Sequence, residues 1–473
     1  MTPGIATFFF AVGILALFAL DRDKNARTSK ALWIPVVWML LAGSRMVSQW
    51  LEAGSVATVS PEQLLDGSPL DRNILAGLIA AGVTVLFGRR REVGTLLRAN
   101  WSILVFFVYC GYSVLWSDYP DVAFKRWMKA VGDLVMILIV LTDPDRPAAL
   151  KRFLARIGFL LVPTSILLIK YYPDLGQVYS GAAGKVRYSG VTLDKNMLGL
   201  VCLVSGLGCV WRLIEALRDR EGTRKAGPLI AQGTVLAMVL VLLWRANSLT
   251  SLGCFMLAAG LMAAMILPAL ARKRGVLHLL VVSVLFFAFG AMFLNVGSDL
   301  VETMGRDSTL TGRTGLWQTL LNMNQYPLLG TGFESFWLGK RLEDLWGIYW
   351  WRPNEAHNGY LEVFLNLGWT GVTLLALVIA TGYRNIVSAF RRDPHTGGLR
   401  LAYFVAGTAY GFTEAAFRMM SPVWIVFVLA IIAVPELGSV PSVRRATSSP
   451  FCHEPWDRTA ILLSRKLPTR RIF

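Results

Sequence analysis

Long apolar runs alternate with short polar segments along most of the chain. Many runs reach about 17 residues or more, the length at which a helix crosses the hydrocarbon core of a bilayer. The pattern predicts an all-α polytopic membrane protein of about 12 to 13 transmembrane helices, because a helix satisfies its own backbone polar groups in lipid. The predicted helices cover residues 3–20, 31–51, 73–88, 101–116, 124–141, 158–172, 196–213, 228–244, 252–270, 276–296, 360–381, 401–416 and 423–434.

One long polar segment, residues 297–358, interrupts this pattern between two predicted helices. Within it, Leu316, Trp317, Leu320 and Leu321 have the spacing of the apolar face of a helix. Residues 326–333 then predict a turn, because their glycines permit backbone geometry that other residues resist. The segment therefore predicts a large, partly helical loop between membrane helices.

These patterns divide the chain into four parts. Residues 1–296 are expected to form an N-terminal transmembrane bundle of about ten helices, and residues 297–358 a large loop. Residues 359–434 are expected to form the C-terminal transmembrane helices. Residues 435–473 read as a basic, disordered cytoplasmic tail, because their apolar content is low and their charge is high.

Composition and charge agree with the membrane interpretation. The 473 residues are 55% hydrophobic and 16% charged, with a mean hydropathy of +0.52, too apolar for an ordinary soluble protein. The net charge of +17 follows from Lys and Arg in alternate loops, which sets orientation in a bilayer, so no nucleic-acid partner is expected. No Gly-rich phosphate loop occurs, so no nucleotide is expected either.

The same alternation of charge predicts the topology. Each loop assigned to the cytoplasm is positive, whereas the long loop has five cations against seven acids, a net charge of −2. This places the long loop and the N-terminus outside the cytoplasm. The five cysteines show no metal-ligand spacing, and four of them lie in apolar runs, so neither a disulfide framework nor a metal site nor another cofactor is expected.

His357 is the only histidine predicted to lie outside the cytoplasm. Histidine can accept a proton near neutral pH and is therefore a natural general base for activating a hydroxyl group. The alternative is a structural histidine at the start of a helix. The neighbours favour the catalytic interpretation, since Glu355 or Asn358 could orient the ring.

A second set of candidates consists of cations predicted at the outer rim of the membrane, where charge is costly and usually marks function. Guanidinium groups bind phosphate oxygens in a bidentate manner, so a diphosphate would suit them. The alternative is snorkelling of long side chains to the interface. The candidates for substrate binding are the cations Arg45, Arg187, Lys195 and Arg245, together with Glu355 and Asn358 beside His357. Arg313, also a predicted outer cation, is assigned with His357 to catalysis.

The second half of the loop is unusually aromatic. Such side chains either anchor a protein in the membrane interface or stack against sugar rings, and the sequence leaves both open. The aromatic residues are Trp337, Trp346, Tyr349, Trp350 and Trp351.

Three segments in and beyond the loop, and one before it, resemble the O-antigen ligase and polymerase superfamily. The segments are Gly312-Arg313-Thr314-Gly315-Leu316-Trp317, Pro327-Leu328-Leu329-Gly330-Thr331-Gly332, His357-Asn358-Gly359-Tyr360-Leu361 and, earlier in the chain, Lys195-Asn196-Met197-Leu198-Gly199. Their order, spacing and outward placement agree with the family. Asp194, before Lys195, departs from it, because a small residue or histidine is expected there.

The resemblance implies a metal-independent, inverting membrane glycosyltransferase of the GT-C type. Its donor would be a glycan on undecaprenyl diphosphate, and it would act at the periplasmic face of the bacterial inner membrane. His357 corresponds to the essential histidine of the family, Arg313 and Lys195 fall in its recurrent motifs, and Arg245 is assigned to the diphosphate by analogy.

Ligases and polymerases share these motifs and differ in the acceptor, which is lipid A-core for a ligase and a second lipid-linked glycan for a polymerase. A lipid-glycan flippase is a third possibility. A flippase predicts charged residues along a path through both leaflets, whereas the candidates here gather on the outer side.

Overall fold

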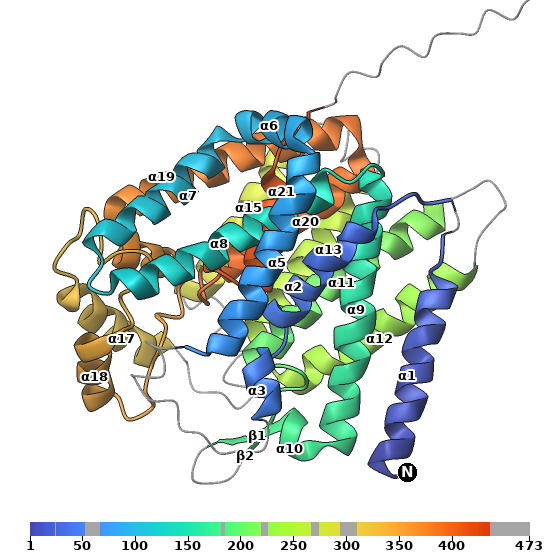
Figure 1. Ribbon diagram of the computed structural model, residues 1–473, viewed down its shortest axis with the longest axis horizontal. Coiled ribbons are helices and arrows are strands. Elements are labelled where there is room, and N and C mark those ends of the chain that lie inside the picture. Colours follow the sequence, from blue (N-terminus) through green and yellow to red (C-terminus); the bar gives the residue numbers. More distant parts are fainter. Residues whose placement is uncertain are drawn as a thin grey trace, which may run out of the picture. The chain divides into compact units, whose positions relative to one another are not determined.

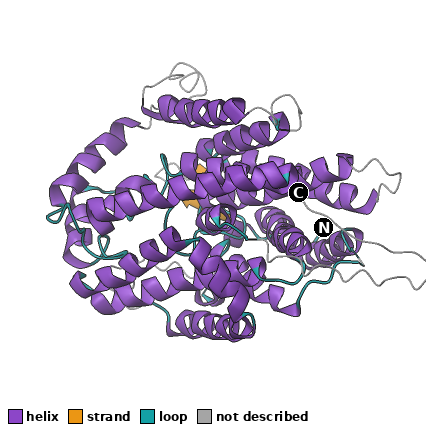
Figure 2. Cartoon of the chain, turned by 90° about the horizontal axis from the view of Figure 1, so that it is seen from above, coloured by secondary structure: helices purple, strands orange, loops and turns teal. Residues whose placement is uncertain are grey.

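The computed structural model describes residues 1–23, 25–52, 67–180, 185–218, 226–265, 274–293 and 310–435. Figure 2 shows that helices dominate these ranges, with one pair of short strands among them. The predicted all-α class is confirmed. The predicted tail lies outside the described residues after residue 435, as does the start of the long loop.

The elements follow one another along the chain as labelled in Figure 1. They are α1 (Pro3–Leu20), η1 (Lys30–Leu32), α2 (Trp33–Ala42), α3 (Val47–Leu51), α5 (Pro69–Gly88), α6 (Arg90–Ala99), α7 (Trp101–Tyr112), η2 (Ser113–Trp116), α8 (Pro120–Leu141), α9 (Arg146–Tyr171), α10 (Pro173–Gly176), β1 (Gln177–Ser180), β2 (Lys185–Tyr188), α11 (Lys195–Arg218), α12 (Ala226–Ala246), α13 (Leu249–Ala264), α15 (Arg274–Phe293), α17 (Leu310–Met323), α18 (Gly339–Ile348), α19 (Gly359–Arg392), α20 (Pro394–Tyr410) and α21 (Pro422–Ile431).

Six described helices are long and apolar enough to cross a membrane, and the bent pair of α6 with α7 and η2 gives a seventh if it counts as one span. These six are α1, α5, α9, α11, α12 and α19, and shorter apolar helices lie in η1 with α2, α13, α15 and α21. The protein is therefore a multi-pass membrane protein. A helix occupies each of the thirteen predicted positions, but several of these helices are too short to span a bilayer unaided.

Several predicted helices end earlier than expected, and two of these early ends bear on the candidate residues. The run at 31–51 is broken, because α2 ends at Ala42 and α3 begins only at Val47. The run at 401–416 is also shorter, since α20 ends at Tyr410. Residues 411–421 instead form a connection of turns between α20 and α21, called here the 411–421 segment. Apolar content alone could not reveal either break.

Helices from before and after the long loop pack against one another. In the described part of the chain α20 contacts α13 and α11, and α19 contacts α7. A strand pair lies between α10 and α11, with Gln177 of β1 opposite Tyr188 of β2 and Val178 opposite Arg187. The loop is thus held against a single bundle of helices.

The loop helices α17 and α18 share a small core of their own and lie close together in Figure 1. Leu316 and Leu320 of α17 are fully buried against Leu342 and Leu345 of α18, as the predicted apolar face requires. Leu321 was expected on that face but is 47% exposed, so this part of the prediction is wrong.

The turn at 327–332 fixes the loop to α19 by direct backbone contact. Gly330 has φ +71° and Gly368, at a break inside α19, has φ +64°. A Cβ on Gly368 would lie 2.3 Å from the backbone of Leu328, and one on Gly330 would lie 2.4 Å from that of Asn366. Both positions therefore require glycine. This contact holds the loop above the start of α19, where His357 lies.

Candidate active site

The backbone around His357 is held on both sides. Asn358 is the N-cap of α19, and its Oδ1 accepts the N–H groups of Tyr360 and Leu361, each at 3.0 Å. On the other side, the N–H of Ala356 donates to Oε1 of Glu362. Asn358 was expected to orient the ring or bind substrate, but its side chain makes these helix-capping bonds.

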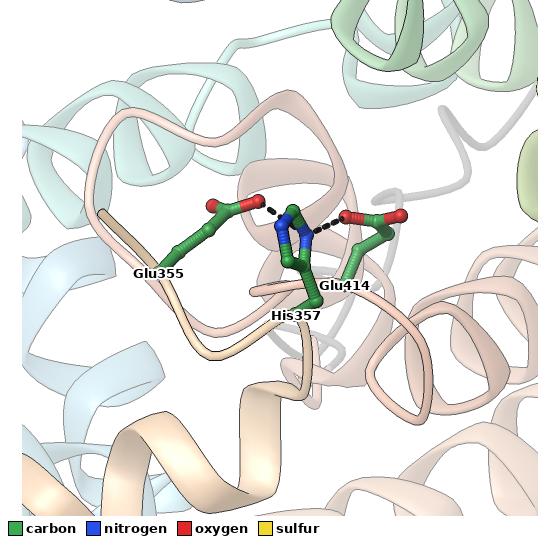
Figure 3. Close-up of side chains that lie close together, drawn as sticks. All are labelled: Glu355, His357 and Glu414. Atoms are coloured by element: carbon green, nitrogen blue, oxygen red, sulfur yellow. Dashed lines mark hydrogen bonds and ion pairs between the residues drawn. The ribbon is translucent and has the colours of Figure 1, made fainter. Parts of the chain in front are cut away.

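The imidazole of His357 lies between two carboxylates, as Figure 3 shows. Oε1 of Glu355 and Oε2 of Glu414 each lie 3.0 Å from Nδ1 of the ring. Glu355 comes from the loop, whereas Glu414 comes from the 411–421 segment, 57 residues further along the chain. The ring also stacks on Trp351, with centroids 6.4 Å apart.

Each carboxylate is itself paired with an arginine. Nη1 of Arg418 lies 3.2 Å from Oε2 of Glu355, and Nη2 of Arg313 lies 3.5 Å from Oε1 of Glu414. Arg313 also donates to the carbonyl of Thr413 at 2.8 Å. These two ion pairs and the histidine between them are called here the His357 cluster, whose members are Arg313, Glu355, His357, Glu414 and Arg418.

This environment changes the charge of the ring. Burial disfavours the imidazolium, but the hydrogen bonds and charges of Glu355 and Glu414 outweigh burial and raise the pKa of His357 to about 10. Burial likewise opposes the charge of Glu355, yet the hydrogen bond and charge of His357 and the charges of Arg418 and Arg313 lower the pKa of this carboxyl group. His357 is therefore mainly an imidazolium at neutral pH when no substrate is bound.

Glu355, His357 and Glu414 could also hold a metal ion, because one ligand atom from each lies within 4.8 Å of the others. Carboxylate and imidazole are common ligands for divalent ions. The two arginines already provide the positive charge that a metal would bring to these carboxylates. The geometry thus permits a metal but does not require one.

One candidate residue, His357, has a strained backbone. Among the described residues, those other than glycine with a left-handed φ are Asn247, Glu334, Arg352, His357 and Met420. Such a conformation costs on the order of 1 kcal/mol or more and persists only where the surroundings impose it. His357 itself has φ +49°, so the position of its ring is imposed by the fold.

A second group of predicted residues lies where α11 begins and α12 ends. The guanidinium of Arg245 is exposed, lies 5.2 Å from the ring centre of Tyr188 and donates to its hydroxyl at 3.1 Å. Nζ of Lys195 lies 3.5 Å from the carbonyl oxygen of Asn247. This group, together with the exposed Arg187 beside Tyr188 on β2, is called here the Arg245 end.

Asp194 caps α11, since its Oδ1 accepts the N–H groups of Asn196 at 2.8 Å and Met197 at 3.0 Å. The departure from the family pattern at this position therefore has a plain structural role.

Arg45 does not point toward either group of candidates. It lies in the break between α2 and α3, is 9% exposed, and its Nη2 donates to the carbonyl oxygens of Leu175 at 2.5 Å and Thr192 at 3.2 Å. Its contacts tie α10 and the start of α11 to α2. In the described residues no hydrogen bond or ion pair joins Arg45 or the Arg245 end to the His357 cluster.

Sequence reasoning missed Glu414 and Arg418. Both were assigned to an apolar helix or its end, although two charged residues in an apolar run are a known sign of function. That sign could have found them. Four cysteines, Cys110, Cys202, Cys209 and Cys254, are buried and form no disulfide among the described residues, and Cys452 lies outside them.

Comparison with known proteins supports the resemblance. Residues 222–376, which contain Arg245, Arg313, Glu355 and His357, match the family described as O-Antigen ligase. The chain is also 26% identical over 310 residues to the exopolysaccharide production protein ExoQ of Rhizobium meliloti (strain 1021), covering 63% of this chain and 68% of that protein. The predicted resemblance to the O-antigen ligase and polymerase superfamily is confirmed.

Proposed function

We propose that this chain, which resembles the O-antigen ligase and polymerase superfamily, is a membrane glycosyltransferase of cell-surface polysaccharide synthesis. It transfers a glycan from undecaprenyl diphosphate to an acceptor hydroxyl group at the periplasmic face of the bacterial inner membrane. The observation that carries the proposal is the His357 cluster, in which a histidine from the matched region, at the end of the long loop, is held by two carboxylates.

In the proposed reaction the acceptor O–H loses its proton to His357. The acceptor oxygen forms a bond to the anomeric carbon, and the bond from that carbon to the diphosphate oxygen breaks. Undecaprenyl diphosphate leaves with the electron pair, and direct displacement inverts the anomeric centre. Arg245 is assigned to the charge that grows on the leaving diphosphate, because preorganised cations stabilise developing charge.

Because the pKa of His357 is raised, the neutral imidazole, which is the form that acts as a base, is the minor form at neutral pH. With a pKa of about 10, the neutral ring is about one part in a thousand at pH 7, a cost of about 4 kcal/mol. That minor form is a correspondingly stronger base. The value of kcat/KM should therefore rise as the pH is raised toward about 10, because the fraction of neutral imidazole increases. A rate that stays flat to pH 9 would make the imidazolium the working form, with a carboxylate of Glu355 or Glu414 taking the proton.

We also propose that no metal takes part. Arg418 and Arg313 balance the two carboxylates, and a diphosphate is already a good leaving group. Transfer should therefore persist in EDTA and should not increase on adding Mg²⁺, Mn²⁺ or Ca²⁺. Loss of activity in EDTA with recovery on adding one of these ions would instead assign Glu355, His357 and Glu414 to a metal site.

The acceptor decides between two versions of the proposal. The family description favours O-antigen transfer to lipid A-core, whereas the name of the ExoQ relative favours polymerisation of an exopolysaccharide. Purified protein incubated with lipid-linked glycan, with and without lipid A-core, separates them. Glycan on the core means a ligase, and long chains without the core mean a polymerase. If neither product forms, the proposal of an enzyme is overturned and a lipid-glycan transporter is favoured.

A further inference from the structure

A cavity of about 90 Å³ lies beside the His357 cluster. Two of its lining residues connect it to the cluster. Arg418 contacts Glu355 at 3.2 Å, and Glu362 accepts the N–H of Ala356, which precedes His357. The wall is formed by α7, α8, α19, the loop and the 411–421 segment. The proposed reaction does not use this space.

The wall has as many acidic as basic side chains. Arg126 and Arg418 face the cavity together with the carboxyl groups of Glu334 and Glu362, so the lining has no excess of basic side chains. A diphosphate site needs an excess of cations, because phosphate oxygens are bound best by unpaired guanidinium or ammonium groups. The cavity therefore suits an uncharged ligand better than an anion.

Of the four carboxyl and amide side chains in the wall, two are occupied by hydrogen bonds to described residues and two are not. Glu362 is occupied, since its second carboxylate oxygen accepts the indole N–H of Trp337 at 2.8 Å. Asn366 is occupied too, because its Oδ1 accepts the N–H of Phe336 at 3.0 Å. By contrast, the Glu334 carboxylate and the Asn354 amide make no hydrogen bond to any described residue.

The fold imposes the position of Glu334. Its φ of +53° is strained for a residue with a side chain, and the surrounding turn holds it there. The N–H of Phe333 donates to Oγ of Ser113 at 3.0 Å, and the hydroxyls of Ser335 and Ser117 lie 2.7 Å apart. These contacts keep the Glu334 carboxylate, a hydrogen-bond acceptor, beside the cavity despite the strain.

Aromatic side chains complete the wall. Phe333, Trp337 and Phe417 are each less than a tenth exposed and form apolar surfaces next to Glu334 and Asn354. A sugar ring has the matching character, because its C–H faces pack on aromatic surfaces while its hydroxyls need carboxylate or amide partners. At about 10–15 Å³ for each water-sized group, the cavity of about 90 Å³ holds on the order of six to nine such groups, enough for one six-membered ring with some of its hydroxyls but not for two rings.

We propose that this cavity is a subsite for one uncharged sugar ring of the glycan substrate, with Glu334 and Asn354 binding its hydroxyl groups. The inference rests on the proposed function, in which both the donor and the acceptor carry sugars. It also assigns a division of labour, with the diphosphate left to the Arg245 end.

Binding can be measured without any reaction. Saturation-transfer NMR on the purified full chain would use methyl glycosides of uncharged hexoses as probes, with methyl glucuronide and inorganic pyrophosphate as anionic competitors. At least one uncharged glycoside should bind. Glu334→Ala should weaken it about tenfold, the loss expected for one hydrogen bond to a charged group, and Asn354→Ala should weaken it about threefold to fivefold, because its amide is neutral. Glu343→Ala, which removes an exposed acid on α18, is the matched control and should change nothing.

Three results would overturn the inference: no binding of any uncharged glycoside, unchanged binding by both cavity variants, or displacement of the glycoside by pyrophosphate. The transfer assay gives an independent test. Glu334→Ala should raise KM for either the donor or the acceptor while kcat changes less than about threefold, and the affected KM identifies which glycan carries the ring. Unchanged KM for both would also overturn the inference. If the wild-type chain transfers nothing, the proposed function fails, yet the NMR result still decides whether the cavity binds sugar.

Discussion

The two groups of cations differ in what surrounds their charge. In the His357 cluster, Arg313 and Arg418 each contact a carboxylate, at 3.5 Å and 3.2 Å. At the Arg245 end, Arg245 is exposed and contacts aromatic rings, 5.2 Å from the centre of Tyr188 and 5.4 Å from that of Trp244. Arginine in the first setting is already neutralised, whereas in the second it keeps its full charge.

This difference suggests different tasks. A paired arginine holds its carboxylate in place, so Arg313 and Arg418 position Glu414 and Glu355 around His357. An arginine stacked on aromatic rings is oriented without being neutralised and can still bind phosphate oxygens. We therefore assign proton transfer to the His357 cluster and diphosphate binding to the Arg245 end. The following predictions test this assignment, from the largest effect to the smallest.

His357→Ala should have the largest effect. Loss of a general base typically lowers the rate by about 100- to 10,000-fold, so glycan transfer should nearly vanish while the protein still inserts and purifies normally. The measurement is transfer by purified protein in detergent. His278→Ala is the matched control, because His278 hydrogen-bonds Tyr383 between α15 and α19 and belongs to neither group. Near-normal transfer by His357→Ala would remove the histidine from the mechanism.

Glu414→Gln should have the next largest effect, because it removes one of the two carboxylates that raise the pKa of His357 above its ordinary value. A base works when unprotonated, so kcat/KM of the wild-type protein should rise about tenfold per pH unit below pH 10. In the variant this rise should end at lower pH, and the plateau should be about ten- to hundredfold lower because the ring is less well oriented and less basic. A pH profile identical to that of the wild type would show that Glu414 does not tune the ring.

The sequence predicted local features well. The turn at 326–333 and the helix predicted from residue 360, which begins at Gly359, were both found, because each depends on a few adjacent residues whose types dictate backbone geometry. The apolar runs found every long helix for the same reason.

Features that depend on distant contacts were missed. Glu414 lies 57 residues beyond His357 and left no local mark except a charge in an apolar run. Arg45 carried the opposite signal, because its charge in a predicted span suggested a phosphate ligand. The break after α2 instead turns it onto backbone carbonyls. In both cases the partner is brought near by packing between helices, which the spacing of apolar residues does not encode.

Arg245→Ala should weaken donor binding without changing the pH profile. Losing one hydrogen bond to a charged phosphate costs about 1.5–3 kcal/mol, so KM for the lipid-linked donor should rise by about tenfold or more. Arg245→Lys should recover only part of the loss, because an ammonium cannot make the bidentate contact or stack in the same way. Arg45→Lys is the matched comparison and should leave donor KM unchanged. Equal effects at both positions would erase the distinction between exposed and carbonyl-bound arginine.

Asp133→Asn should disturb the His357 cluster indirectly, through the 411–421 segment. The buried Asp133 accepts the indole N–H of Trp38 at 2.8 Å and the backbone N–H of Met420 at 3.0 Å, and so fixes the 411–421 segment that carries Glu414. The amide of asparagine has only one acceptor oxygen, so its NH2 group would face one of these two N–H groups. The lost hydrogen bond should lower the free energy of unfolding by about 1–3 kcal/mol. Thermal unfolding should begin a few degrees lower, and kcat should fall severalfold with donor KM unchanged. An unchanged unfolding midpoint would mean that this carboxylate does not hold the segment.

Added salt should affect the Arg245 end but not the His357 cluster, and this is the smallest of the expected effects. Exposed charges are screened beyond about 10 Å at 0.1 M salt, whereas partly buried ion pairs are screened much less. Raising NaCl from about 0.05 to 0.5 M should therefore increase donor KM about two- to threefold through the exposed Arg245, and leave kcat and its pH dependence unchanged because Glu414 is only 8% exposed. In Arg245→Ala the salt dependence of donor KM should disappear. If salt instead shifted the pH profile of kcat, the His357 cluster would be open to solvent, and the proposed division between a buried proton-transfer site and a diphosphate site at the exposed Arg245 would fail.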